Sequence, residues 1–321
     1  PNDGLGWCEC DKCKAMDDPD PHIGLAKRVL TFNNQVAAIV SKKFPDRWLF
    51  YYGEYGNIPG PPVGMKSDNT ILTGIVNSYD LLHNLYDPKS WSNKGFRERM
   101  KNWQSISSHF FIYEWLNYSS LPSPMLYTVG ERIQYYKHLG AVGYSGEVLG
   151  RSPVNDLTMY VISELLWDSN QDYNKMIKEF FTKYFAESSV PMEKYYRILH
   201  EPTLYSTNSG CNIPESAWTP QIVSKLETEL SKAKSLANQD VIKRRIDREE
   251  KCLNLIKQVS IAYRMLNLWT SGDADAKLRG KVYTDNAISL LNSISDEDIV
   301  ADTYILDQLK ILRRTVYESD T

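Results

Sequence analysis

The sequence predicts an α/β fold in which the C-terminal part of a (β/α)8 TIM-type barrel is followed by an all-α helical region. Strand-like and helix-like segments alternate along the first two-thirds of the 321 residues, an order that favours parallel strands joined by right-handed crossovers. Acidic residues stand where the strand-like runs end, which is where such a barrel carries its catalytic groups. Long amphipathic helices make up the rest of the chain.

Four short aromatic and apolar runs, each bounded by turn-forming residues, are predicted to be buried strands. They read RWLFYYGEYG, TILTGIVNSY, HFFIYEWLNY and AVGYSGEVLG. The segments around them carry apolar residues three and four positions apart, the spacing of an amphipathic helix. We expect these helices at residues 23–43, 96–107 and 127–139.

The number of strands falls short of a complete barrel. About four strands follow Asp3, whereas a barrel of this type needs eight, so we expect three or four strand–helix units to precede residue 1. Half a barrel would expose the edges of its sheet and its apolar interior. We therefore expect this chain to form a homo-oligomer, to pack against the missing N-terminal half of the barrel, or to be a piece of a larger protein.

The remainder is predicted to be helical. Helices are expected at residues 154–167, 219–237 and 241–270, and in the segments DYNKMIKEFFTKYF and PMEKYYRILH. The two long helices have one apolar stripe each, which favours an antiparallel hairpin or small bundle, and two weaker helices finish the chain.

Three regions follow from these assignments. We expect a partial catalytic barrel at residues 1–168, a helical extension and linker at 169–213, and a helical hairpin or bundle at 214–321. The linker assignment rests on EPTLYSTNSGCNIPES, which is rich in Ser, Asn, Pro and Gly.

Acidic and aromatic residues recur at the predicted strand ends. The acidic ones are Asp3, Glu54, Glu114 and Glu147. The aromatic ones are Tyr52, Tyr55, Trp115, Tyr118 and Tyr144. Carboxyl groups that converge from several strands are what glycoside hydrolysis requires. Any single acid after a strand is more often a helix cap or a solvated loop residue, so the hypothesis rests on the recurrence.

Composition excludes several classes of protein. The chain is 42% hydrophobic and 24% charged, which is ordinary for a soluble globular protein. No apolar run approaches the ~18 residues needed to span a membrane. The net charge of −3 is spread along the chain without a basic stripe, which argues against binding nucleic acid. The 21 tyrosines and 8 tryptophans offer flat apolar faces with polar edges, which suit sugar rings as well as protein cores.

Cys8, Cys10 and Cys13 leave three interpretations open. Three thiolates are one short of the four ligands of a structural zinc site, so His22, a later cysteine or a residue from the missing half would complete it. A disulfide between two of them would suit an exported enzyme, and reduced cysteines that only pack together are the third interpretation. In each case we expect the cluster to position Asp3.

A family resemblance runs through five segments: NDGLGWCECDKC, FNNQVAAIVSKKFPDRWLFYY, FFIYEWLNY, YYKHLGAVGYSGE and ISELLWDSNQDYNKMIKEFFTKYF. They resemble the C-terminal half of a bacterial glycoside-hydrolase-like family formerly grouped as a domain of unknown function. That family is distantly similar to α-glucuronidases and β-N-acetylhexosaminidases and includes endo-β-N-acetylglucosaminidases. The resemblance covers about residues 1–200, and the helical region from Pro214 onward matches more loosely.

The resemblance implies a role for each acidic residue. Asp3 would end barrel strand four, Glu54 would follow strand five, and Glu114 and Glu147 would end strands seven and eight. Glu114 would be the base, nucleophile or transition-state stabiliser, although many relatives carry Asp in its place. Asp3 would take the strand-four role or orient an N-acetyl group that attacks the anomeric carbon. Glu147 would bind substrate hydroxyls or tune Glu114.

The predicted function is that of a glycoside hydrolase acting on N-acetylhexosamine- or uronate-containing glycans. The reaction requires no cofactor, and a metal at Cys8, Cys10 and Cys13 would be a structural zinc. His83, on the long loop after TILTGIVNSY, is the histidine that we expect to contact the glycan. By resemblance, the protein acts outside the cytoplasm, in the periplasm, at the cell surface or as a secreted protein. The alternatives are a non-catalytic carbohydrate-binding protein on a degenerate barrel and a helical interaction module.

Overall fold

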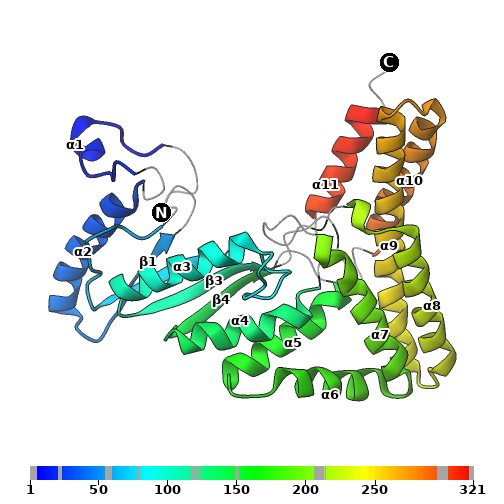
Figure 1. Ribbon diagram of the computed structural model, residues 1–321, viewed down its shortest axis with the longest axis horizontal. Coiled ribbons are helices and arrows are strands. Elements are labelled where there is room, and N and C mark those ends of the chain that lie inside the picture. Colours follow the sequence, from blue (N-terminus) through cyan, green and yellow to red (C-terminus); the bar gives the residue numbers. More distant parts are fainter. Residues whose placement is uncertain are drawn as a thin grey trace. The chain divides into compact units, whose positions relative to one another are not determined.

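The fold is described from a computed structural model of the chain (Figure 1). The described residues are 6–20, 24–54, 60–77, 80–116, 121, 124–148, 152–205, 213, 215–294 and 303–317. They form two compact units, here called the sheet unit and the helical unit. The sheet unit comprises Pro1–Tyr79, Leu85–Trp115 and Arg132–Glu147, and the helical unit comprises Asp80–Asn84, Leu116–Glu131 and Val148–Thr321.

Four strands form the sheet of the sheet unit. They are β1 (Leu49–Glu54), β2 (Ile71–Asn77), β3 (Phe110–Leu116) and β4 (Gly143–Val148). They lie in the order β1-β2-β3-β4, and the pairs β1–β2 and β2–β3 are parallel. All four predicted strands are confirmed. Among the described residues the sheet has four strands and is not closed into a barrel.

Helices flank these strands in the sequence (Figure 1). They are α1 (Asp11–Lys14), α2 (Ala26–Lys43), α3 (Trp91–Ile106) and α4 (Leu126–His138), of which the residues from Arg132 onward belong to the sheet unit. Helix α3 begins five residues before the predicted start at residue 96, because the side chain of Ser90 accepts a hydrogen bond from the backbone N–H of Asn93 and caps it. The other predicted helices of this part agree with the structure to within three residues at each end.

The sheet has two distinct faces because successive side chains of a strand point to opposite sides. One face, here called the covered face, carries Tyr51, Thr73, Phe110, Ile112 and Glu114, all of them buried. Helix α3 lies against this face, because a Cβ at Gly53 of β1 would lie 2.8 Å from the ring of Trp103 in α3. Directly after α3, the hydroxyl of Ser107 is 2.8 Å from that of Thr73. The opposite face, here called the open face, carries the half-buried or exposed side chains of Phe50, Tyr52, Phe111 and Tyr113.

The helical unit is built from seven long helices among the described residues. They are α5 (Pro153–Trp167), α6 (Tyr173–Phe185), α7 (Ser189–His200), α8 (Pro220–Leu236), α9 (Asp240–Thr270), α10 (Ala274–Ile294) and α11 (Thr303–Leu312). Ser152, Asp172 and Thr219 cap the first turns of α5, α6 and α8 with their side-chain oxygens. The predicted helices are confirmed, and α10 extends over 21 residues where a weak helix was expected.

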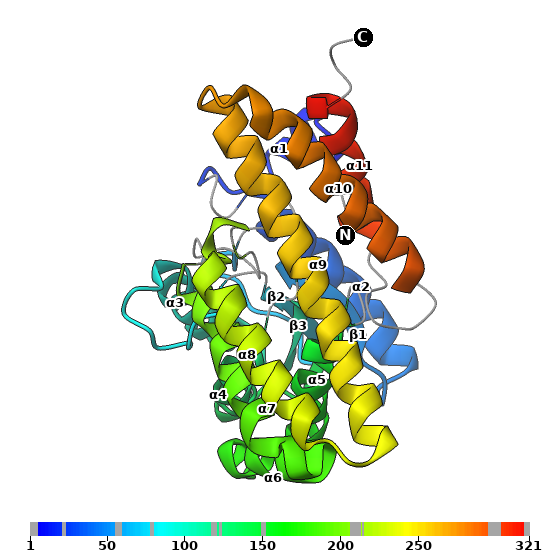
Figure 2. The same cartoon turned by 90° about the vertical axis from the view of Figure 1, so that its right-hand side faces the viewer.

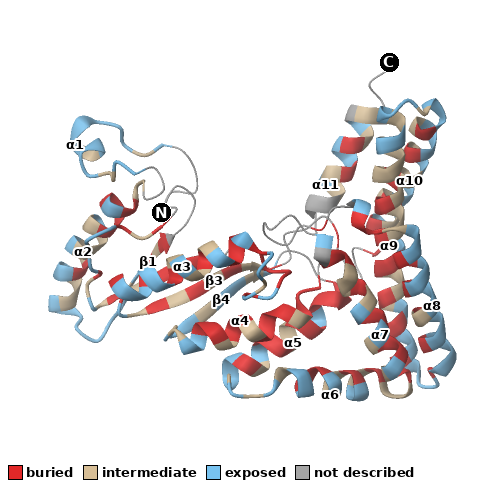
Figure 3. Ribbon diagram, viewed as in Figure 1, coloured by how far each residue is buried: buried red, intermediate tan, exposed pale blue. Residues whose placement is uncertain are grey.

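Apolar stripes hold the helical unit together. Helix α9 packs against both α8 and α10, and α8 against α7 (Figure 2). Buried residues recur along one side of α8 and α9 (Figure 3), and aromatic side chains such as Tyr195, Tyr196 and Trp218 are fully buried. In the part of the chain that the structure describes, none of the helices combines the length and the hydrophobicity needed to cross a membrane.

Candidate active site

The predicted site residues fall into three groups. Asp3, Tyr55 and Tyr118 lie outside the described residues, as does the side chain of Glu54, whose backbone ends β1. The sheet unit holds Glu114, Glu147 and three of the predicted aromatic residues. These aromatic residues are Tyr52, Trp115 and Tyr144. His83 belongs to the helical unit.

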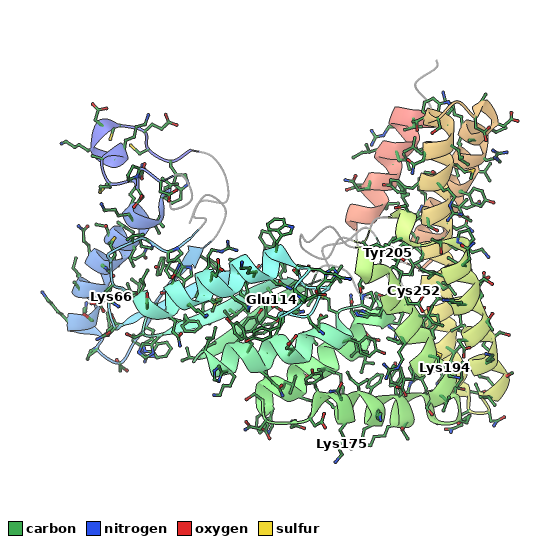
Figure 4. All side chains as sticks on the ribbon, viewed as in Figure 1. Lys66, Glu114, Lys175, Lys194, Tyr205 and Cys252 are labelled. Atoms are coloured by element: carbon green, nitrogen blue, oxygen red, sulfur yellow. The ribbon has the colours of Figure 1, made fainter. Side chains whose placement is uncertain are left out.

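Glu114 lies on the covered face of β3, and its side chain is fully buried (Figure 4). Its carboxylate forms an ion pair with the buried guanidinium of Arg132 in α4, with 3.1 Å between Nε and Oε1. The hydroxyl of Tyr136, one turn further along α4, donates to Oε1. The hydroxyl of Tyr144 in β4 donates to Oε2 at 2.7 Å. These four residues are here called the Glu114 cluster.

The surroundings of Arg132 and Tyr144 keep both groups protonated. Burial is the largest influence on Arg132 and by itself would lower its pKa, but the charge of Glu114, the two tyrosines and the hydrogen bond with Glu114 together raise that pKa, so the guanidinium stays charged. Burial, followed by the charge of Glu114, raises the pKa of Tyr144 well above its ordinary value, so this phenol stays protonated. The contacts of Arg132, Tyr136 and Tyr144 with the Glu114 carboxylate are suited to linking α4 and β4 to β3.

Glu147 lies in a different environment, on the opposite side of the sheet from the Glu114 cluster. The hydroxyl of Tyr113, from the open face of β3, donates a hydrogen bond to Oε2 of Glu147. The side chain of Glu147 is half-buried, so solvent reaches its surroundings. Burial, the hydrogen bond to Glu147 and the charge of that carboxylate raise the pKa of Tyr113. The phenol therefore remains a hydrogen-bond donor near neutral pH.

Aromatic rings surround this pair on the open face. Phe50, Tyr52, Phe111 and Tyr113 are here called the aromatic patch. The ring centroid of Phe50 lies 4.9 Å from those of Tyr52 and Phe111, and the centroid of Tyr52 lies 5.5 Å from that of Tyr113. Gly74 makes room for the patch, because a Cβ there would lie 2.9 Å from the Phe111 ring and 3.0 Å from the Phe50 ring. The patch offers apolar ring faces beside a carboxylate and a phenol, a combination that suits a sugar.

His83 forms a buried pair with Asp80 in the helical unit. Nδ1 of His83 lies 2.8 Å from Oδ2 of Asp80, and the backbone N–H groups of Leu82 and His83 donate to Oδ1 of the same carboxylate. Both side chains are buried. The contacts fix the orientation of the imidazole. Contact between His83 and a glycan stays a prediction.

Cys8, Cys10 and Cys13 lie together in the sheet unit, and their Sγ atoms are all within 4.8 Å of one another. These three residues are here called the cysteine cluster. Among the described residues all cysteines, Cys252 included, are free thiols, so the structure has no disulfide at the cluster. The arrangement could bind a metal ion. Cys8 and Cys13 also line a cavity of about 650 Å³, together with residues of α2 and with Phe50 and Tyr52 of the aromatic patch.

Sequence reasoning missed Arg132, Tyr136 and Tyr113 as partners of the two carboxylates, whereas Tyr144 was among the predicted aromatic residues. Arg132 and Tyr136 are four residues apart in a helix that was predicted, on a stripe that also contains Val129 and Ile133, and all four are buried. An arginine within an apolar stripe needs a buried acidic partner, and this signal could have identified the pair. The side chain of Tyr113 is expected on the open face from the alternation of side chains along β3, once it is known which face is open.

A comparison with protein families matches residues 1–197 to the family described as Domain of unknown function (DUF4838). The match covers more than half of the chain and includes both carboxylates and the cysteine cluster. No curated protein matches the chain.

Proposed function

We propose that this chain, which belongs to the DUF4838 family of domains of unknown function, is a glycoside hydrolase acting on N-acetylhexosamine- or uronate-containing glycans. The observation that carries the proposal is the pair of Glu147 and Tyr113 beside the aromatic patch. A half-buried carboxylate with a phenol donor can act on a glycosidic bond, while the neighbouring rings accept the apolar face of a sugar. The resemblance to a glycoside-hydrolase-like family over about residues 1–200 points the same way.

We further propose that β1 to β4 are the C-terminal strands of a (β/α)8 barrel. Two features of the sheet support this. The strands follow one another in sequence order without the reversal typical of a doubly wound sheet. Ser107, directly after α3, and Arg132, in the C-terminal part of α4, contact Thr73 and Glu114 on the covered face, whereas the open face carries aromatic side chains that stay half-buried or exposed. In a complete barrel the open face would be the interior.

The different environments of Glu147 and Glu114 favour a division of roles between the two carboxylates. Glu147 is the better candidate for the group that meets the substrate, as acid, base or nucleophile, because its side chain is half-buried. Glu114 is fully buried against Arg132, which favours a positioning role through Tyr144 and β4. Hydrolysis needs a second carboxyl group, and we propose Glu54, the last residue of β1, or Asp3, which the family resemblance implies to end a strand.

The proposed reaction requires no cofactor. General acid–base or nucleophilic chemistry by carboxyl groups is sufficient for glycoside hydrolysis. A structural zinc at the cysteine cluster would hold a loop and take no part in bond cleavage. The same family resemblance supports a location outside the cytoplasm, in the periplasm, at the cell surface or in the medium.

The test is a glycan-release assay by mass spectrometry on N-glycoproteins and uronate-rich polysaccharides. The Glu147→Gln variant keeps the size of the side chain and an acceptor for Tyr113, and we expect it to lose activity by about 10²–10⁴-fold, the range for one acid–base group. Tyr113→Phe should lose activity with the fold intact. Glu98→Gln, at an exposed position of α3, is the matched control and should release glycans at the wild-type rate.

Other outcomes separate the competing functions. Release that survives in Glu147→Gln would overturn the role of Glu147 and direct attention to Asp3, Glu54 and Glu114. Glycan binding without any release would support the carbohydrate-binding alternative. A folded chain that neither binds nor releases glycans, but captures a protein through its long helices, would support the interaction module.

A further inference from the structure

We infer that Cys8, Cys10 and Cys13 form a binding site for one thiophilic d¹⁰ metal ion, Zn²⁺ or Cu⁺, which fixes the segment 6–20 in place. The inference is independent of the proposed hydrolase activity. It rests on the spacing of the three sulfur atoms, the contacts of Arg28 with this segment and the lack of an apolar core in it.

The spacing of the sulfur atoms fits a shared ion. The three Sγ atoms lie within 4.8 Å of one another, and those of Cys8 and Cys10 are 3.5 Å apart. With a metal–sulfur bond of about 2.3 Å, two thiolates on one tetrahedral ion are about 3.8 Å apart. Shifts of about 1 Å or less would therefore bring all three sulfurs onto one ion.

The three sulfur atoms are close enough to affect one another's charge. The sulfurs of Cys8 and Cys10 are within hydrogen-bond distance of each other, and that of Cys13 lies within 4.8 Å of both. Three thiolates this close repel one another, and a bound cation removes that repulsion.

Arg28 in α2 ties both ends of the segment to the sheet unit. Its Nη1 donates to the carbonyl oxygen of Cys8 at 2.8 Å, and its Nε donates to Oδ1 of Asp17 at 2.7 Å. The guanidinium also places a positive charge beside the sulfurs of Cys8 and Cys13. Arg28 thus anchors the ends of the segment, and the cysteine cluster lies between them.

The segment has no apolar core of its own. None of the residues 6–20 is buried, and α1 is only four residues long. A chain segment that cannot bury enough apolar surface is commonly stabilised by a metal or a disulfide. The described cysteines form no disulfide, so a metal ion is the cross-link that fits.

The chemistry of the ligands selects the class of ion. Thiolates prefer Zn²⁺ and Cu⁺ over Mg²⁺ and Ca²⁺, which take oxygen ligands. Zn²⁺ needs a fourth ligand to complete a tetrahedron, whereas three sulfurs alone satisfy trigonal Cu⁺. The two ions therefore differ in the number of ligands that they require beside the three thiolates.

The experiment loads the reduced chain with Zn²⁺ or, without oxygen, with Cu⁺, and measures the retained metal by mass spectrometry. We expect one ion per chain, with Cys8, Cys10 and Cys13 protected from alkylation when peptides are analysed one by one. Cys10→Ser should weaken binding by about 100-fold or more, because even loss of an outer-shell partner costs 10–100-fold. Cys252→Ala, at a buried position of α9 (Figure 4), should bind metal as the wild type does.

The retained ion and a chelator complete the test. Retention of Zn²⁺ or of Cu⁺ identifies the ion, and its removal by a chelator should lower the melting temperature of the wild type but not that of Cys10→Ser. Circular dichroism verifies that both variants fold. A reduced, folded wild type that retains neither ion would overturn the inference, as would equal binding by Cys10→Ser or a disulfide between two of these cysteines in the chain as purified.

Discussion

Glu114 and Arg132 show that a buried charge is stabilised by a neighbouring charge of opposite sign. Both side chains are fully buried, so each charge is stabilised by the other. Replacing Glu114 with Gln would remove the carboxylate that pairs with the guanidinium of Arg132. We expect Glu114→Gln to lower the free energy of unfolding by about 3–5 kcal/mol, the range for breaking a buried pair from one side. Urea unfolding of the purified chain measures this loss.

Two further variants make that prediction specific. Glu179 pairs with Lys183 at 3.3 Å on the exposed side of α6, and Glu179→Gln should change stability by less than about 1 kcal/mol. Adding Arg132→Met to Glu114→Gln should restore part of the loss, because the buried cation that lost the Glu114 carboxylate is then absent. A Glu114→Gln chain as stable as the Glu179→Gln chain would mean that the Glu114 cluster does not anchor β3.

At the level of single residues, the sequence predicted positions along the strands but not the faces to which they point. Glu114 and Glu147 were both expected at strand ends, and both lie within the last residues of β3 and β4. The run HFFIYEWLNY is apolar or aromatic at alternate positions on both faces, so its pattern cannot tell which side helices cover. The contact between Glu114 and α4 depends on tertiary packing, which a single sequence does not encode locally.

At the level of elements, we expect replacement by alanine to change stability in opposite directions at the glycines of α3 and α4. Gly130 in α4 packs under Tyr173 of α6 within the helical unit, and a Cβ at position 130 would lie 2.4 Å from that ring. Gly130→Ala should therefore destabilise the chain by about 1–3 kcal/mol through overpacking, despite the better helix propensity of alanine. Thermal or urea unfolding measures the change.

Gly95 in α3 is the matched control. The nearest atom to a Cβ there is the end of Arg99, at 3.8 Å, so alanine fits without a clash. Gly95→Ala should stabilise the chain by up to about 1 kcal/mol, the difference in helix propensity. If both substitutions moved stability in the same direction, close packing would not be what requires glycine at position 130.

Element boundaries were predictable wherever a local signal existed. The strands follow from short apolar runs between turn-forming residues, and the long helices α8 and α9 from apolar spacing and the cap at Thr219. The early start of α3 depends on Ser90, a cap that is followed by WSNKG, which has no apolar stripe. The length of α10 is set by packing against α9, so its own weak pattern gave little indication of it.

For the molecule as a whole, Glu249 makes stability depend on pH. Burial raises the pKa of this residue in α9 to about 8, although the hydrogen bond that the Tyr196 hydroxyl donates to its Oε1 opposes the shift. Its Oε2 has no hydrogen-bond partner among the described residues, which leaves that oxygen to carry the proton. In the unfolded chain the pKa returns to its ordinary value of 4.5.

The sign of the effect follows from proton binding. Between pH of about 4.5 and 8, the folded chain holds a proton at Glu249 that the unfolded chain has released. The free energy of unfolding must therefore fall as pH rises through this window, by at most about 5 kcal/mol from this one group. Below the window both states are protonated, so the contribution of Glu249 to the pH dependence disappears.

Comparing urea unfolding at pH 5 and pH 9 in three chains isolates this contribution. Glu249→Gln cannot titrate but still accepts from Tyr196, so it should lose less stability between the two pH values than the wild type. Glu250→Gln changes the next residue, a half-exposed partner of Lys234, and should keep the wild-type dependence.

Asp156, Arg248 and Cys252 also influence this region, but they are present in all three chains, so their titration cancels in the comparison. Equal pH dependence in the wild type and Glu249→Gln would mean that Glu249 is already ionised in the folded protein, and the raised pKa would then be wrong.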